Sequence, residues 1–117
     1  ILNNPYMKVN TTAVRVPVFR SHSESITIET EKKITPEKAK EILSNAPGVK
    51  LVDDISNNKY PMPIDTSNQD LIYVGRIRED ISAENSLNLW VCGDQIRKGA
   101  ATNAIQIAEL LINRRLV

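Results

Sequence analysis

The sequence predicts an α+β fold with a mixed, mainly antiparallel sheet and helices on one face of that sheet. Stretches of alternating apolar residues are segregated from two stretches with helical spacing, which is typical of α+β domains. Only one connection between strands is long enough to hold a helix, which favours antiparallel or mixed pairing. The 117 residues amount to one domain.

Alternating apolar side chains predict several short strands. The first predicted strand, at 14–18, includes Pro17, which has no N–H to donate within a sheet and therefore belongs at an edge or a bulge. After an interruption at 21–23 the alternation resumes at Ile26 and Ile28. The remaining strands are predicted at 49–53, 71–77 and 87–92.

Two helices are predicted from capping residues and apolar spacing. Thr35 can cap a helix, Pro36 suits its first position, and Pro47-Gly48 ends it. The second helix, 99–114, is apolar over so much of its girth that we expect it to contact more than one neighbour. Residues 54–68, rich in Asn, Asp, Ser and Pro, form a long loop, and such loops are usually functional or mobile.

Composition excludes several functional classes. Fifteen Lys and Arg against 14 Asp and Glu give a net charge of +1, and aromatic residues make up 4%, so neither nucleic acid nor a membrane is an expected partner. No apolar run approaches the ~18 residues that span a bilayer. The single Cys excludes an internal disulfide framework and suits a reducing compartment. The chain starts at Ile1, which we interpret as a piece of a longer protein.

Charged and titratable residues gather between Arg15 and Glu24. Arg15 and Arg20 are suited to bind a carboxylate or phosphate, and His22 can transfer a proton near neutral pH. Together they resemble half of an active site that lacks its nucleophile. The alternative is a surface or hydrogen-bonded histidine at the end of a strand.

Other candidate groups are weaker. Cys92 shares a strand face with Trp90 and is expected to be a core or subunit contact rather than a nucleophile. Small residues at 99–101, at the start of the last helix, could admit a flat ligand or an anion, or could simply pack under the sheet. One His and one Cys, 70 positions apart, make no metal site, and no glycine-rich phosphate loop is present.

Three stretches carry a resemblance to a known family. They are Val14–Val18 with Ser21–Glu24, then Asp70–Arg78, and finally Asn88–Glu109. In this order they resemble the C-terminal part of aspartate-semialdehyde dehydrogenase, over nearly the whole chain. The resemblance implies a C-terminal domain like that of glyceraldehyde-3-phosphate dehydrogenase, in a cytoplasmic homodimer or homotetramer.

The resemblance also implies a reaction. The family converts aspartyl 4-phosphate to aspartate 4-semialdehyde and phosphate with NADPH, through an acyl intermediate on a cysteine, in threonine, methionine, lysine and diaminopimelate biosynthesis. His22 matches the family's acid/base histidine, Arg15 matches the arginine that binds the substrate carboxylate, and Asn103 matches a residue near NADP. Ser21 departs from the glycine that many members carry before the His-Ser pair.

Spacing adds a condition for a shared site. Arg15 and His22 are seven positions apart, so one unbroken strand would place them on opposite faces. If both serve one substrate, the strand must break or bulge between them, at Pro17 or at 21–23.

The family's nucleotide-binding Rossmann half and catalytic cysteine are absent from this sequence. We therefore expect residues 1–117 to be part of a catalytic and dimerisation domain, inactive alone and a poor binder of NADP, with the helix at 99–114 packed on the missing half. The alternative is a non-enzymatic module for dimerisation or small-molecule regulation. Leu71, Tyr73 and Trp90 fit either a sheet that packs across a dimer or a sheet covered by its own helices.

Overall fold

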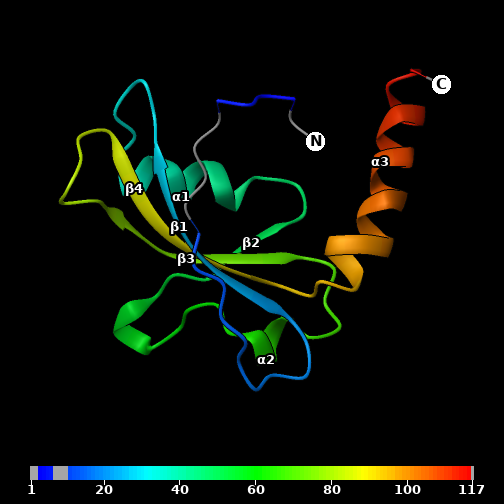
Figure 1. The fold of residues 1–117 in the computed structure, drawn as a ribbon, viewed down its shortest axis with the longest axis horizontal. Coiled ribbons are helices and arrows are strands. Elements are labelled where there is room, and N and C mark those ends of the chain that lie inside the picture. Colours follow the sequence, from blue (N-terminus) through cyan, green and yellow to red (C-terminus); the bar gives the residue numbers. More distant parts are fainter. Residues whose placement is uncertain (1–2, 7–10, 117) are drawn as a thin grey trace.

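A four-stranded sheet organises the computed structural model, which describes residues 3–6 and 11–116 (Figure 1). The strands are β1 (His22–Glu29), β2 (Val49–Leu51), β3 (Ile72–Glu79) and β4 (Ser86–Gly93), in the spatial order β1-β4-β3-β2. β4 pairs antiparallel with both β1 and β3, whereas β2 pairs parallel with β3. The predicted α+β class with a mixed, mainly antiparallel sheet is confirmed.

Local sequence signals set the limits of α1 (Pro36–Ser44). Thr35 Oγ1 accepts a hydrogen bond from the Lys38 N–H at 3.3 Å, and Pro36 occupies the first turn, as predicted. Gly48, with φ of +78°, then adopts the left-handed conformation that turns the chain into β2. α1 packs against β2 and β3 and covers one face of the sheet (Figure 1).

The long loop at 54–68 covers the other face and contains two short helical turns, η1 (Ile55–Asn57) and α2 (Pro63–Thr66). The Trp90 Nε1–H donates to the Pro61 carbonyl at 3.0 Å. A Cβ on Gly75 would lie 2.0 Å from the Val52 carbonyl oxygen, so only glycine permits this close approach. Trp90 therefore packs under its own chain, which is one of the two arrangements we considered for it.

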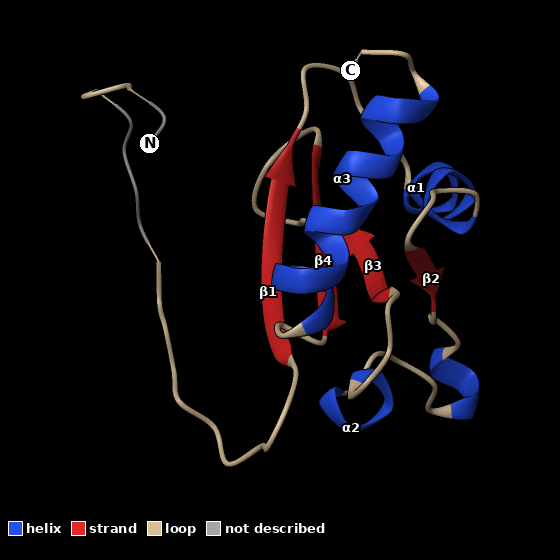
Figure 2. Cartoon of the chain, turned by 90° about the vertical axis from the view of Figure 1, so that its right-hand side faces the viewer, coloured by secondary structure: helices blue, strands red, loops and turns tan. Residues whose placement is uncertain are grey.

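The strand predicted at residues 14–18 is wrong. Val14, Val16 and Val18 lie in an exposed, irregular segment that runs away from the sheet before β1 (Figure 2). Alternation predicts a half-buried strand only where a neighbouring strand can pair with it. No strand of the described residues pairs with this segment.

The predicted C-terminal helix consists of one turn of π-helix, η2 (Arg97–Ala101), followed by α3 (Thr102–Asn113). Asp70 anchors its base, because it accepts hydrogen bonds from Arg97 Nε at 2.7 Å and Nη2 at 2.9 Å and from Thr102 Oγ1 at 2.9 Å. These bonds, from Arg97 first, hold the pKa of Asp70 below its usual value. No residue of α3 is buried, and α3 rises from the end of the sheet without lying on it (Figure 1).

None of the helices in the described residues is long and apolar enough to cross a bilayer.

Asp94, directly after β4, is a fully buried carboxylate that joins three segments. Its Oδ2 accepts from the Asn68 N–H at 2.8 Å, and its Oδ1 accepts from the N–H groups of Ile96 at 2.9 Å and Arg97 at 3.1 Å. Arg20 Nη1 lies 4.0 Å from Oδ2. Burial opposes ionisation, but the three amides and Arg20 outweigh it and lower the pKa of Asp94.

Ser21 adopts a left-handed backbone, with φ of 77°, immediately before β1. Its N–H donates to Gln95 Oε1 at 2.7 Å, and its buried Oγ accepts from Thr66 Oγ1 at 2.9 Å. This conformation costs a residue with a Cβ about 1–2 kcal/mol relative to glycine. The two hydrogen bonds hold Ser21 there and fix where the strand starts.

Replacing Ser21 by Gly and by Ala separates backbone strain from the lost hydroxyl. Both variants lose the bond from Thr66, worth about 1 kcal/mol, but only Ser21→Gly relieves the left-handed strain. We expect Ser21→Gly to remain within about 0.5 kcal/mol of the unmodified chain and Ser21→Ala to be less stable by about 1 kcal/mol. Urea unfolding measures both values. An alanine variant as stable as the glycine variant would contradict the strain.

Asp94→Asn should destabilise the fold in a pH-dependent way. An amide has only one accepting oxygen, so at least one buried N–H loses its partner, at a cost of about 1–3 kcal/mol. The folded pKa of Asp94 is lowered, so its stabilisation is present above the unfolded value of 3.8 and is lost as the pH falls through the folded pKa. In urea unfolding, the stability difference between the unmodified chain and the Asp94→Asn variant should therefore shrink as the pH falls below 3.8. The control is Asp65→Asn, at an exposed residue, whose free energy of unfolding should stay within about 0.5 kcal/mol of the unmodified chain. A stability loss in Asp94→Asn that does not depend on pH would contradict the role of the charge.

Candidate functional site

His22 is the first residue of β1 and is exposed. In the β1–β4 register it lies opposite Gly93, which has no side chain to fill the space beside the imidazole. A Cβ on Gly93 would lie 2.3 Å from Ile72 Cδ1, so a side chain at this position would have to displace the end of the Ile72 side chain. The neighbourhood of His22 is thus open because β4 carries no side chain at the position opposite it.

A cavity of about 120 Å³ opens beside His22, on the sheet face that α1 also covers. Glu24, two residues further along β1, projects from the same face. Three kinds of polar group therefore face the cavity: the imidazole of His22, which can transfer a proton, the carboxylate of Glu24 and the side-chain amide of Gln95. Its lining is formed by His22, Glu24, Ile72, Val91, Gly93, Asp94, Gln95 and Gly99.

The backbone break required between Arg15 and His22 is present. β1 begins only at His22, Ser21 is left-handed, and residues 11–21 lie outside the sheet. No regular strand runs from 14 to 28, so the alternation of side chains does not force Arg15 and His22 onto opposite faces. The expectation of a break at 21–23 is confirmed.

Arg15 itself is exposed in the irregular segment and does not line the cavity beside His22. Its role as the carboxylate anchor stays a prediction. Arg20, the second arginine of the cluster, is engaged by Asn68 Oδ1, to which its Nη1 donates, and lies near Asp94. Arg20 therefore contributes to the buried support of the site.

Cys92 is fully buried in β4. Burial raises the pKa of its thiol, and this effect outweighs the hydrogen bond with Ser23, whose Oγ lies 3.2 Å from the sulfur. A thiol that is buried and protonated at neutral pH is a poor nucleophile. The structure supports the interpretation of Cys92 as a core residue.

Asn103, which the family resemblance places near NADP, lies apart from the cavity beside His22. Asn103 lies in the first turn of α3, half-buried, and is not part of the lining beside His22. A cavity of about 120 Å³ is also smaller than the roughly 300–1,000 Å³ of ordinary ligand pockets. Within 3–6 and 11–116, no group of three or more His, Cys, Asp or Glu side chains could hold a metal ion.

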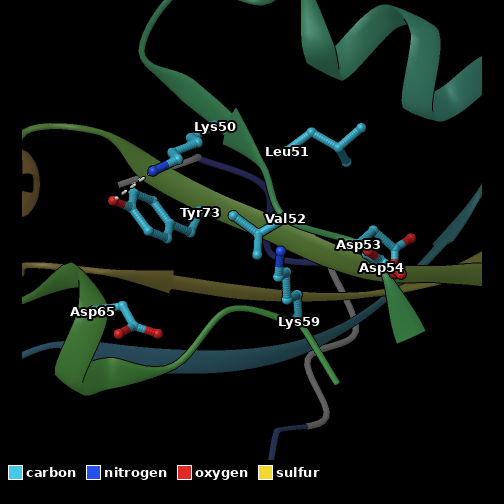
Figure 3. A pocket seen from close by; sticks show the side chains of 8 residues that line it. All are labelled: Lys50, Leu51, Val52, Asp53, Asp54, Lys59, Asp65 and Tyr73. Carbon is cyan, nitrogen blue, oxygen red and sulfur yellow. Dashed lines mark hydrogen bonds between the residues drawn. The ribbon is translucent and has the colours of Figure 1, made fainter. Parts of the chain in front are cut away.

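A larger, open hollow of about 570 Å³ lies on the opposite face of the sheet, between β2, β3 and the long loop (Figure 3). Lys50 Nζ donates to the Tyr73 hydroxyl at 3.2 Å and lies 4.6 Å from the centre of its ring. The hollow contains neither His nor Cys, so it offers no acid/base or nucleophile of the kind found beside His22. Its lining is formed by Lys50, Leu51, Val52, Asp53, Asp54, Lys59, Asp65 and Tyr73.

Gln95 and Asp94 line the candidate site, and the sequence patterns did not identify them as site residues. Gln95 lines the cavity, and its Oε1 accepts the hydrogen bond from the Ser21 N–H. Asp94, the residue before it, accepts from the Asn68 N–H and so holds this end of the sheet together. An Asp before a helical turn was the available signal, because such a carboxylate commonly accepts from the first amides of the turn. The link from Gln95 to Ser21 spans 74 positions and has no local signal.

Comparison with known proteins gives a consistent result. Residues 1–98 match the family described as semialdehyde dehydrogenase, dimerisation domain. Curated aspartate-semialdehyde dehydrogenases from Aquifex aeolicus and Prochlorococcus marinus are 56% and 59% identical over 117 and 114 residues, which are 100% and 97% of this chain but 34% and 33% of those proteins. The chain thus spans about one third of the length of these relatives.

Solved structures agree with the sequence comparison. The crystal structure of aspartate semialdehyde dehydrogenase II from Vibrio cholerae superimposes with a TM-score of 0.77 at 43% identity, over 85% of this chain and 29% of that one. The same enzyme complexed with ASA gives the same values. The fold, the dimerisation-domain match and these relatives together show that the chain belongs to the aspartate-semialdehyde dehydrogenase family.

Proposed function

We propose that this chain supplies the proton-transfer group and the substrate anchor of a longer aspartate-semialdehyde dehydrogenase, which interconverts aspartyl 4-phosphate and aspartate 4-semialdehyde with NADPH. The observation that carries the proposal is His22 beside a cavity bordered by Gly93, in a chain whose 117 residues are 56% identical to the matching third of such an enzyme. A related structure complexed with ASA supports a small-molecule site in this family.

His22 is the proposed acid and base. Its backbone is fixed on one side by the β1–β4 register and on the other by Ser21, which Gln95 holds. A fixed backbone limits the positions that the imidazole can reach, and proton transfer requires a donor and acceptor within hydrogen-bond distance. The imidazole takes the proton of a cysteine thiol supplied by the rest of the protein and returns a proton to the leaving group.

Arg15 is the proposed anchor for the substrate carboxylate. A guanidinium binds a carboxylate through two parallel hydrogen bonds and fixes its orientation. Arg15 precedes the left-handed Ser21 and lies in a segment outside the sheet, so strand geometry does not restrict the direction of its side chain. The substrate would then be held at one end by Arg15 and transformed at the other beside His22.

We assign NADP to the longer protein. Asn103, in the first turn of α3, is the residue of this chain that we propose to lie near the cofactor, with α3 packed on a nucleotide-binding half. The chain alone is therefore expected to be inactive and to bind NADP poorly. The complete enzyme would be a homodimer or homotetramer in the cytoplasm and would serve lysine, threonine, methionine and diaminopimelate synthesis.

His22→Asn in the full-length protein tests the acid/base role. Asn keeps a similar size but cannot exchange a proton near neutral pH, so kcat should fall at least about a hundredfold while KM stays within a few-fold. Steady-state reduction of NADP with aspartate semialdehyde and phosphate measures both constants. An unchanged kcat would remove His22 from the mechanism and would favour the alternative of a non-enzymatic dimerisation or regulatory module.

Arg15→Leu tests the anchor. Loss of the hydrogen bonds between the guanidinium and the substrate carboxylate costs about 1.5–3 kcal/mol, which should raise KM for aspartate semialdehyde roughly tenfold to a hundredfold. KM for phosphate should change much less, because phosphate does not carry the recognised carboxylate. The matched control is Arg78→Leu, on β3, which is exposed and donates only to the Arg76 carbonyl. Equal effects of the two substitutions would contradict the role of Arg15.

A further inference from the structure

We propose that the open hollow between β2, β3 and the long loop is a second ligand site, which binds an acidic α-amino acid. Such a molecule carries two carboxylates and one ammonium group. The hollow has a volume of about 570 Å³, within the roughly 300–1,000 Å³ of ordinary ligand pockets. It lies on the sheet face opposite the cavity beside His22, so the inference goes beyond the proposed function and does not rest on it.

The chain itself uses two of the three carboxylates that line the hollow. Asp53, whose side chain is 1% exposed, accepts from two backbone N–H groups of β3 at 2.9 and 3.1 Å. Lys40 Nζ also lies 3.0 Å from its Oδ2. Asp54 accepts from Ser56 Oγ at 2.7 Å and from Asn57 Nδ2 at 2.8 Å. These two carboxylates are therefore engaged in holding the fold.

Three other charged side chains of the hollow remain available to a ligand. Among the ion pairs of the described residues, none includes Lys50, Lys59 or Asp65. Lys50 Nζ donates to the Tyr73 hydroxyl at 3.2 Å, and an ammonium group has two further N–H groups to donate. The hollow therefore offers two ammonium groups and one carboxylate.

An acidic α-amino acid complements this set of charges. Each lysine ammonium can hold one carboxylate of the ligand, and the Asp65 carboxylate can hold its ammonium group. In Figure 3, Val52 lies between Tyr73 and Lys59, so the short carbon chain of the ligand would meet an apolar side chain between the charged groups. A basic amino acid would place two ammonium groups against two lysines, which is unfavourable.

The three charged side chains stand on backbone that is already fixed. Lys59 exchanges both backbone hydrogen bonds with Asp54, at 2.8 and 2.9 Å, and Lys50 belongs to β2. Thr66, the neighbour of Asp65, is fully buried and donates to Ser21 Oγ at 2.9 Å. Binding would therefore order side chains but little backbone, which lowers its entropic cost.

Isothermal titration calorimetry of the full-length protein with L-aspartate tests the site. L-aspartate also resembles the end of the substrate that Arg15 is proposed to hold, so the titration is made in the Arg15→Leu protein as well as in the unmodified one. Binding should persist in Arg15→Leu and weaken at least about fivefold when Lys59→Ala is added, because charge-assisted hydrogen bonds are lost.

The matched control is Lys32→Ala, which removes an exposed lysine outside the hollow that enters none of the ion pairs of the described residues. The Kd of L-aspartate should not change in this variant. The proposal is overturned by an Arg15→Leu protein that binds no L-aspartate, or by a Lys59→Ala variant whose Kd matches that of the control.

Succinate, which has both carboxylates but no ammonium group, tests the part of Asp65. In the Arg15→Leu protein, Asp65→Asn should weaken L-aspartate at least about fivefold and should not weaken succinate. Succinate that binds the Arg15→Leu protein as tightly as L-aspartate does would overturn the assignment of an amino acid. Asp65 is exposed, so the substitution is expected to leave the fold intact.

The second site and the proposed function can fail separately. L-aspartate that binds the unmodified protein but not Arg15→Leu would refute the second site and support the anchor. L-aspartate that depends on Lys59 and Asp65, in a protein whose KM for aspartate semialdehyde is unchanged by Arg15→Leu, would support the second site and refute the anchor.

Discussion

The buried carboxylate of Asp94 is the interaction on which the arrangement around His22 depends. An ionised group without partners in a protein interior is costly, so three backbone amides and Arg20 converge on it. Those partners belong to the segment before β1, the segment before β3 and the π-turn that follows β4. One charge thereby fixes three chain segments at one end of the sheet. Gln95, the next residue, is placed to hold Ser21, and Ser21 in turn sets the first residue of β1. The position of His22 is therefore determined by contacts far from it in sequence.

Much of the fold could be predicted because its signals are local. Thr35, Pro36 and Gly48 carry the start and end of α1 within a few residues, and the alternation in 71–77 and 87–92 identified β3 and β4 within about two residues of their limits. The prediction failed at 14–18, where the alternation is equally clear. Strand formation there would need a pairing partner, and the sheet of the described residues supplies none. The π-turn at Arg97–Ala101 was also beyond prediction, since Asp70 and Asp94 stabilise it from other segments.

The candidate site, like the fold, has parts that could be predicted from the sequence and parts that could not. Spacing alone required a break between Arg15 and His22, and the left-handed Ser21 satisfies that requirement. Residue chemistry alone made His22 a candidate proton-transfer group and made Cys92 a poor candidate nucleophile, and the burial of Cys92 supports the second inference. Neither spacing nor chemistry could identify Gly93 as the residue that opens the space beside His22. That fact depends on the register of β1 against β4, which is a property of the assembled sheet.

The exposed apolar side chains are distributed in a way that separates the surfaces of the domain. α3 exposes Ile105 and Ile112, yet its base is fixed by the paired bonds of Arg97 with Asp70, so it projects its apolar face in a defined direction. The loop that carries the exposed Met62 and Ile64 is likewise anchored, through Pro61 and Thr66, on the other side of the sheet. Large exposed apolar patches on a protein usually mark places where another surface binds. These exposed apolar side chains lie on different elements of a chain that spans about a third of the length of its relatives. β4 connects the two surfaces within the domain, because it carries Trp90 beneath the loop and leads through Asp94 into the π-turn at the base of α3.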